Sequence, residues 1–144
     1  MKQSTALDIL KSGKNVFLTG QAGSGKTYVI NQYVQYLWNS EVVVAITAST
    51  GIAATHIGGV TSHSWSGIGI KEYLTDHDIE LIIQKENIFK NITKAKVLII
   101  DEISMLSANV IDMIDKVCQQ VRRNNRPFGG LQVILCGDFF QLPP

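Results

Sequence analysis

The residues best suited to chemistry form a glycine-rich loop near the start of the chain. Residues 20–27 read Gly-Gln-Ala-Gly-Ser-Gly-Lys-Thr and follow the apolar run 16–18. A glycine, four variable residues and Gly-Lys-Ser/Thr form the phosphate-binding loop pattern. Glycines permit backbone angles at which successive N–H groups point at one anion. The predicted nucleotide-binding residues are Gly20, Ala22, Gly23, Ser24, Gly25, Lys26 and Thr27.

The last residues of this loop have separate roles. Lys26 adds a positive charge for the β- and γ-phosphates of ATP, and Thr27 offers a hydroxyl to Mg²⁺. A helix that begins near Gly25 would direct its positive end toward the same phosphates. The alternative is a chance match in a strand-to-helix turn. Strand, loop and helix nevertheless occur here in the order that the pattern requires.

A pair of carboxylates, Asp101-Glu102, follows four consecutive apolar residues. This places both acids at the carboxyl end of a buried strand, the edge at which ligands bind in an open α/β sheet. We predict that Asp101 holds Mg²⁺ beside Thr27, either directly or through a group bound to the metal. Glu102 would be the catalytic base that deprotonates the attacking water. A solvated acidic strand end is the alternative. No arginine is clearly placed to supply a cation for the transition state.

Gln141 follows the last predicted strand at the same edge. It could sense the γ-phosphate and couple hydrolysis to movement. It could equally be a surface amide on a proline-closed turn, and the residues themselves favour neither interpretation.

Residues 47–69 are rich in hydroxyls and glycines and contain His63 and Trp65. Such a segment suits contacts with a phosphate backbone and is too polar for a core element. Its length is typical of a functional or a disordered loop, although residues 52–54 could form a short helical turn within it. For Trp65 alone, packing in the core is the favoured interpretation. The basic residues 122–126 are explained by a helix carboxyl end.

Composition limits the class of protein. The chain has 144 residues, of which 45% are hydrophobic and 17% charged, as in one globular domain. With 13 basic and 12 acidic residues, any nucleic-acid contact must come from a local surface. Cys118 and Cys136 lack metal-ligand spacing and are expected to be buried free thiols. We expect no membrane segment and no secretion. The compartment would be the cytoplasm, or the nucleus or mitochondrion in a eukaryote.

The predicted elements alternate between strand and helix, which favours an α/β fold with a mostly parallel sheet flanked by helices. The first strand, which contains three consecutive apolar residues, is expected to be buried on both faces. Helices are predicted at 1–12, from the loop to about 39, and from Ser107 to 122–126, with a weaker helical pattern over 71–96. Strands are predicted at 15–19, 42–47, 97–100 and 131–136.

In order and spacing, the motifs of this chain resemble those of the petite-integration-frequency (PIF) DNA helicases, the RecD-like, 5′-to-3′ branch of helicase superfamily one. The resemblance covers almost the whole chain. Its most specific blocks are Pro-Phe-Gly-Gly at 127–130 and Gly-Asp-Phe-Phe-Gln-Leu-Pro-Pro at 137–144. The other matching segments are 13–27, 47–54, 57–61, 63–64 and 100–106.

The resemblance implies a RecA-like P-loop NTPase domain in an enzyme that couples Mg–ATP hydrolysis to translocation on single-stranded DNA and to duplex unwinding. It implies that Gln3 reads adenine. It also implies that the last strand lies between the first and third, which would bring Gln141 beside Lys26 and Asp101. The implied contacts with single-stranded DNA are Thr47, Ser49, Thr61, His63 and Ser64.

Family members continue into a second RecA-like domain, so the resemblance implies that residues 1–144 are a partial first motor domain, truncated after the third helicase motif. The second motor domain would supply the arginines that face the γ-phosphate. Without an outer neighbour, the first strand would present an apolar edge. We therefore expect self-association through this edge, or its burial by a partner.

Two other interpretations were weighed against an ATP-dependent helicase. A small-molecule kinase would need an arginine-rich lid and an acceptor pocket, and the sequence shows neither. A binding module that holds nucleotide or DNA without turnover could describe this fragment on its own.

Overall fold

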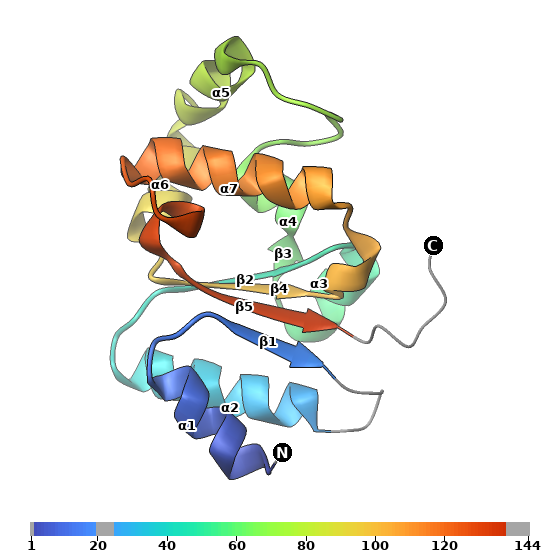
Figure 1. The fold of residues 1–144 in the computed structure, drawn as a ribbon, viewed down its shortest axis with the longest axis vertical. Helices are drawn as coiled ribbons and strands as arrows, with labels where there is room; N and C mark the ends of the chain where they lie inside the picture. The colour runs from blue at the N-terminus through green and yellow to red at the C-terminus, as the bar shows by residue number, and fades with distance from the viewer. Residues whose placement is uncertain (1, 20–24, 138–144) are drawn as a thin grey trace.

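The computed structural model describes residues 2–19 and 25–137. Within these residues, five parallel strands form one sheet in the order β1-β5-β4-β2-β3 (Figure 1). This confirms the α/β class and the predicted place of the last strand between the first and third. The strands are β1 (Val16–Thr19), β2 (Val44–Ala48), β3 (Val60–Thr61), β4 (Val97–Asp101) and β5 (Gln132–Gly137).

Helices cover both faces of this sheet (Figure 1). On one face, α1 (Gln3–Lys11) and α2 (Lys26–Asn39) bury one hydrophobic cluster against the strands. On the other, α4 (Ser62–Ser66) and α7 (Ala108–Arg122) belong to a second cluster. The buried stripe of α2 is the predicted one and consists of Val29, Ile30, Tyr33, Val34 and Leu37.

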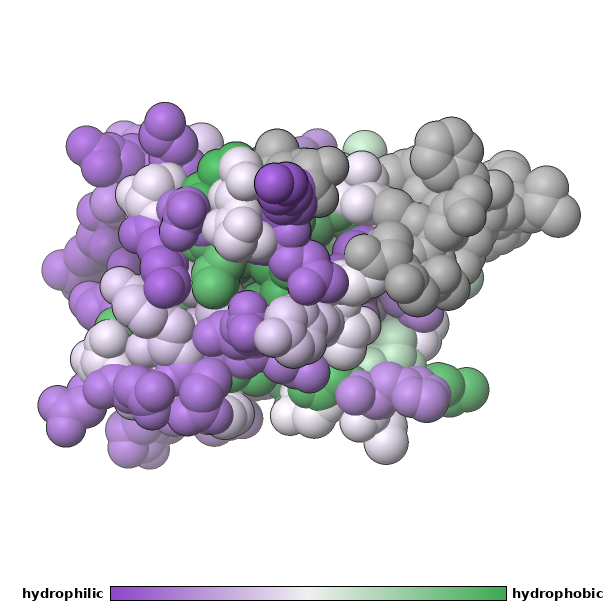
Figure 2. Space-filling view, turned by 90° about the horizontal axis from the view of Figure 1, so that it is seen from below, coloured by the Kyte–Doolittle hydropathy of each residue, from purple (hydrophilic) through white to green (hydrophobic). Residues whose placement is uncertain are grey.

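The outer surface of the α1–α2 layer is mainly polar. Figure 2 shows this side as a mosaic of hydrophilic and intermediate residues with small hydrophobic areas between them. Across the described part of the chain, no helix is both long and apolar enough to cross a membrane.

Strand β1 lies at the edge of the sheet, as the resemblance implied. It pairs only with β5 among the described strands, and Phe17 keeps 46% of its surface exposed. The prediction that β1 is buried on both faces was therefore wrong. The apolar residues of β4, in contrast, are all buried, because this strand has neighbours on both sides.

Residues 47–69 fold into regular elements: Thr47 lies in a strand and residues 52–54 in a helix, as the sequence indicated, whereas the expectation of a polar loop over the rest of the segment was wrong. The segment continues β2 and then forms α3 (Gly51–Ile57), β3 and α4. The hydroxyls are accommodated in the core because they bond to one another and to the backbone. Thr47 Oγ1 donates to the carbonyl of Ile99 at 2.8 Å, and Ser62 Oγ donates to Thr47 Oγ1 at 2.9 Å. Trp65 is buried in the second hydrophobic cluster, as predicted.

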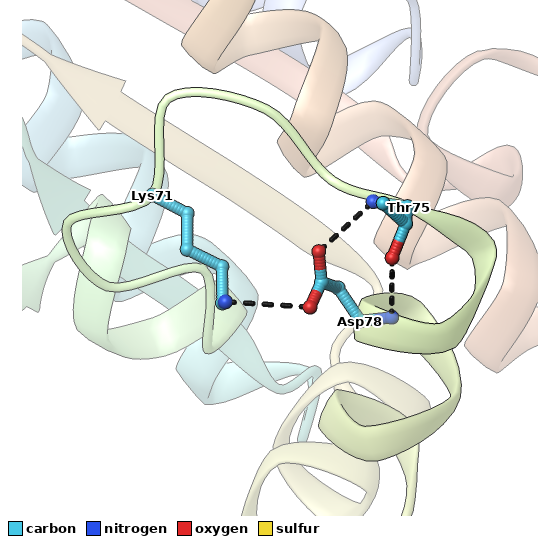
Figure 3. A network of polar contacts seen from close by, with 3 residues as sticks. All are labelled: Lys71, Thr75 and Asp78. Atoms are coloured by element: carbon cyan, nitrogen blue, oxygen red, sulfur yellow. Dashed lines mark hydrogen bonds and ion pairs between the residues drawn. The ribbon is translucent and has the colours of Figure 1, made fainter.

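The weak helical pattern over 71–96 corresponds to two short helices, α5 (Asp76–Ile83) and α6 (Glu86–Lys94). A capping box fixes the start of α5 (Figure 3). The Thr75 N–H donates to the Asp78 carboxylate at 3.0 Å, and the Asp78 N–H donates to Thr75 Oγ1 at 3.1 Å. The hydrogen bonds with Thr75, together with the Lys71 ammonium nitrogen 3.3 Å from Asp78 Oδ1, hold the pKa of the Asp78 carboxyl below its usual value.

The basic end of α7 is a structural clamp. The Arg122 guanidinium donates to the carbonyls of Gly129 and Ala95, each at 2.9 Å. Gly129 belongs to the turn η2 (Pro127–Gly130) and has φ +63°, and an added Cβ would lie 2.6 Å from the carbonyl oxygen of Cys118. A side chain at Gly129 would therefore push the turn away from α7.

Gln132, at the start of β5, links α1, the segment before β1 and α2 through its side-chain hydrogen bonds. Its amide donates to the carbonyls of Leu10 and Lys14 at 3.0 and 2.8 Å, and its oxygen accepts from Tyr33 at 2.7 Å. We expect Gln132→Leu to lower the free energy of unfolding by about 3 kcal/mol, because buried polar groups lose their partners. Urea denaturation measures this change. The exposed Gln120→Leu is the control and should stay within about 0.5 kcal/mol.

Candidate nucleotide-binding site

The parallel strands bring the predicted chemical residues to one edge of the sheet. Thr19 of β1 pairs with Gly137 of β5, and Ala48 of β2 pairs with Asp101 of β4. The first residue of α2, Lys26, lies at this same edge and shares a cavity with Asp101. Residues separated by 75 positions in the chain therefore meet where the strands end.

Gly25 precedes α2 and has φ +94°, a left-handed conformation that favours glycine. An added Cβ here would lie 2.2 Å from the side-chain amide nitrogen of Gln3. Gln3, Gly25 and Lys26 also line one cavity of about 380 Å³, together with Phe17 and Thr19. Gln3, the predicted base-reading residue, thus lies directly against the start of α2.

A second cavity, of about 220 Å³, holds the predicted metal ligands. Lys26, Thr27 and Asp101 all line it. One cationic group, one hydroxyl and one carboxylate therefore face the same space. The other lining residues are Ile30, Asn31, His56, Ile57 and Cys136.

Cys136 also lines this cavity, but its thiol is not a reactive group. It is a buried free thiol, as predicted, and so is Cys118. Burial raises the pKa of the Cys136 thiol to about 12, with the Asp101 carboxylate adding to the effect and Lys26 opposing it. Burial likewise raises the pKa of Cys118 to about 12. Both thiols therefore stay neutral at physiological pH.

Glu102 is exposed and has a left-handed backbone, with φ 52° and ψ 47°. This conformation is uncommon for a residue with a side chain and indicates local strain. Its N–H donates to Asp101 Oδ1 at 2.9 Å. The bond fixes the Asp101 carboxylate at the end of β4, where the chain turns into the short helix η1 (Ile103–Met105).

Other predicted site residues lie outside the described part of the chain. These are Gly20, Ala22, Gly23, Ser24 and Gln141.

His56 and Asn31 are cavity residues that the sequence analysis missed. No motif marks either one. Asn31 lies one turn after Thr27 on α2 and so shares a helix face with it, whereas the place of His56 beside Asp101 depends on how α3 packs, which local patterns do not encode.

The predicted DNA contacts are divided by their burial. Thr47 is fully buried with its hydroxyl bonded inside the core, so a direct contact between this hydroxyl and DNA does not fit the structure. Ser49 is also buried, but its hydroxyl has no hydrogen-bond partner within the described ranges. Buried hydroxyls normally have a partner, so Ser49 is a candidate for a bound ligand.

The other three predicted DNA contacts lie around the start of α4. Thr61 is the N-cap, and its hydroxyl oxygen accepts from the Ser64 N–H at 3.1 Å. His63 is half-buried and Ser64 is exposed. Thr61, His63 and Ser64 therefore present polar groups at one surface, next to the end of β2.

Known proteins are similar to this chain in sequence and in fold. The helicase Pif1 of Psychrobacter sp. (strain PRwf-1), described as an ATP-dependent DNA helicase, is 59% identical over the whole chain, which spans 22% of that protein. An ATP-dependent DNA helicase PIF1 from Danio rerio is 46% identical over 99% of this chain and 22% of its own length. The chain thus spans about a fifth of the length of these relatives.

Solved structures agree with the sequence comparisons. The crystal structure of Pif1 helicase from Candida albicans matches with a TM-score of 0.92 and 41% identity, over 99% of this chain and 33% of that one. Pif1 helicase from Bacteroides, in complex with ADP-AlF3 and ssDNA, matches with a TM-score of 0.78 and 36% identity, over 99% and 32%. The RecA-like fold is therefore shared with these helicases. The PIF1-like helicase family model matches residues 2–144, and the chain belongs to this family.

Proposed function

We propose that this chain is the nucleotide-binding part of the first motor domain of an ATP-dependent 5′-to-3′ DNA helicase. The observation that carries the proposal is the convergence of Lys26, Thr27 and Asp101 on one cavity, beside the contact between Gln3 and Gly25. The relatives named as ATP-dependent DNA helicases support it.

The side chains present fit Mg²⁺ and ATP. The described residues contain no group of three or more His, Cys, Asp or Glu side chains that could hold a metal by themselves. Mg²⁺ suits such a place, because it is usually bound by one or two protein oxygens and by substrate phosphates. We propose Thr27 and Asp101 as its protein ligands and Lys26 as the contact to the β- and γ-phosphates. The metal would neutralise charge on the transferring phosphoryl group.

Glu102 is the proposed catalytic base. It follows Asp101 directly, and its left-handed backbone turns the chain away from the direction of β4. An exposed carboxylate at this edge can accept a proton from a water molecule near the γ-phosphate. Gln141 is proposed to sense the γ-phosphate, and Gln3 to hydrogen-bond the adenine base.

We propose that single-stranded DNA lies across the surface formed by Ser49, Thr61, His63 and Ser64. Among the described residues, the Ser49 hydroxyl is buried and lacks a hydrogen-bond partner, which supports a role for it in holding a ligand. The chain carries almost no net charge, which favours a local groove over a broad basic face.

His63→Ala should weaken binding of a single-stranded oligonucleotide by about fivefold, because one hydrogen bond to a phosphate is lost. Nucleotide affinity should not change. Fluorescence anisotropy of a labelled oligothymidine measures the first quantity, and competition with a fluorescent nucleotide measures the second. His77→Ala, an exposed histidine on α5, is the matched control. Unchanged DNA affinity in His63→Ala would contradict the proposed DNA surface, and equal loss of both affinities would indicate misfolding.

The edge of β1 supports a further partner proposal. A second motor domain would complete the active site with arginines, and the chain on its own would self-associate through β1. Phe17→Lys should reduce the mass measured by solution scattering at high concentration, since a lysine protects an edge strand. Phe89→Lys is the control, because Phe89 is 44% exposed but lies on α6. A monodisperse wild-type monomer would contradict self-association.

A further inference from the structure

The cavity that Lys26, Thr27 and Asp101 line also contains the imidazole of His56, to which the proposed function assigns no role. His56 lies in the last turn of α3 and lines the cavity of about 220 Å³ with Lys26, Thr27 and Asp101. Within residues 2–19 and 25–137, its side chain makes no hydrogen bond or ion pair, and the residue is exposed.

The backbone holds His56 in this place. Gly58 ends α3 with φ +72°, and the Gly59 N–H returns to the carbonyl of Ala54 at 2.8 Å. An added Cβ on Gly59 would lie 2.2 Å from the carbonyl oxygen of Ile46, so the chain after α3 approaches β2 closely. Ile57 packs against the hydrophobic cluster of α2. The end of α3 is therefore anchored on both sides of His56.

The cavity that His56 lines is the one that would contain the β- and γ-phosphates. Thr27 and Asp101 are the residues proposed to hold Mg²⁺, which would neutralise charge on the terminal phosphates. Lys26 approaches the same two groups. A side chain that shares a cavity with all three therefore faces the terminal end of the nucleotide and not its base, because Gln3 lines the other cavity.

Resting on the proposed function, we infer that His56 is a specificity-determining residue that donates a hydrogen bond to the γ-phosphate or to a water molecule of the Mg²⁺ shell. An imidazole carries an N–H donor whether it is neutral or protonated, so this role does not depend on its charge. Hydrogen bonds to charged groups are among the stronger ones in proteins. His56 would thereby supply from α3 a hydrogen-bond donor at the terminal end of the nucleotide.

Two substitutions separate this role from packing. His56→Leu removes the donor and keeps a side chain of similar bulk, whereas His56→Gln keeps an N–H donor. His77→Leu is the matched control, because His77 is an exposed histidine on α5, and α5 contributes no residue to this cavity. Each variant is compared with the wild type by the affinity for a non-hydrolysable ATP analogue and for ADP, both with Mg²⁺, using competition against a fluorescent nucleotide.

We expect His56→Leu to weaken binding of the ATP analogue about tenfold and binding of ADP less than twofold. His56→Gln should restore most of the lost affinity, and His77→Leu should change neither value. Equal weakening of both nucleotides, or no change in the ratio between them, would overturn the role of His56 while the wild type still binds nucleotide. If the wild type itself fails to bind either nucleotide, the proposed function falls first, so the two failures are distinguishable.

Discussion

Replacing Lys26 with alanine should reduce the affinity for Mg–ATP by on the order of 100-fold, because one ammonium group that approaches two phosphates is removed. Lys26 is half-buried at the first position of α2 and lines both cavities of the site. No other lysine or arginine lines either cavity within the described residues. Isothermal titration calorimetry of wild type and variant measures the change.

A matched control is Lys85→Ala, which removes an exposed lysine just before α6. It should bind Mg–ATP as the wild type does. Thermal unfolding of both variants should stay near that of the wild type, since neither side chain belongs to a hydrophobic cluster. If Lys26→Ala bound Mg–ATP with wild-type affinity, the phosphates could not lie at the start of α2.

Glu102→Gln should leave the affinity for Mg–ATP within a factor of about two and lower the rate of hydrolysis by about 10²- to 10⁴-fold, the usual contribution of a general base. The amide keeps the size of the carboxylate but cannot accept the proton of the attacking water. The substitution should also keep the backbone bond from the Glu102 N–H to Asp101, because that bond does not involve the side chain.

The rate is measured in the complete protein under single-turnover conditions, which separate the chemical step from product release. Glu80→Gln, an exposed glutamate on α5, serves as the control and should hydrolyse ATP normally. Normal turnover in Glu102→Gln would show that another group accepts the proton and that Glu102 is not the catalytic base.

The convergence of Lys26, Thr27 and Asp101 on one edge of the sheet could be predicted because these residues belong to short, local patterns. The four apolar residues from Val97 to Ile100, followed by Asp101, predict a buried strand that ends in a carboxylate. The helix beginning at Lys26 and the stripe of α7 follow from equally local spacing. Parallel strands then bring these ends to one edge without further information from the sequence.

The failures concern contacts between distant segments. The apolar run of β1 matches that of a central strand, and only the pairing of the whole sheet shows that β1 lies at its edge. Ser62 lies in a segment with the composition of a loop, yet its hydroxyl donates to that of Thr47 inside the core. His56 carries no motif, and its place beside Asp101 arises from the packing of α3.

We propose that this chain binds Mg–ATP at the edge where β1, β4 and β5 end, and that a second motor domain is needed for efficient turnover. The most direct test measures Mg–ATP binding and hydrolysis by this chain, with and without a single-stranded oligonucleotide, beside Lys26→Ala. The account predicts binding that depends on Lys26, with little hydrolysis stimulated by DNA. Robust stimulated hydrolysis by these residues alone would contradict it, because the chain would then complete its own active site.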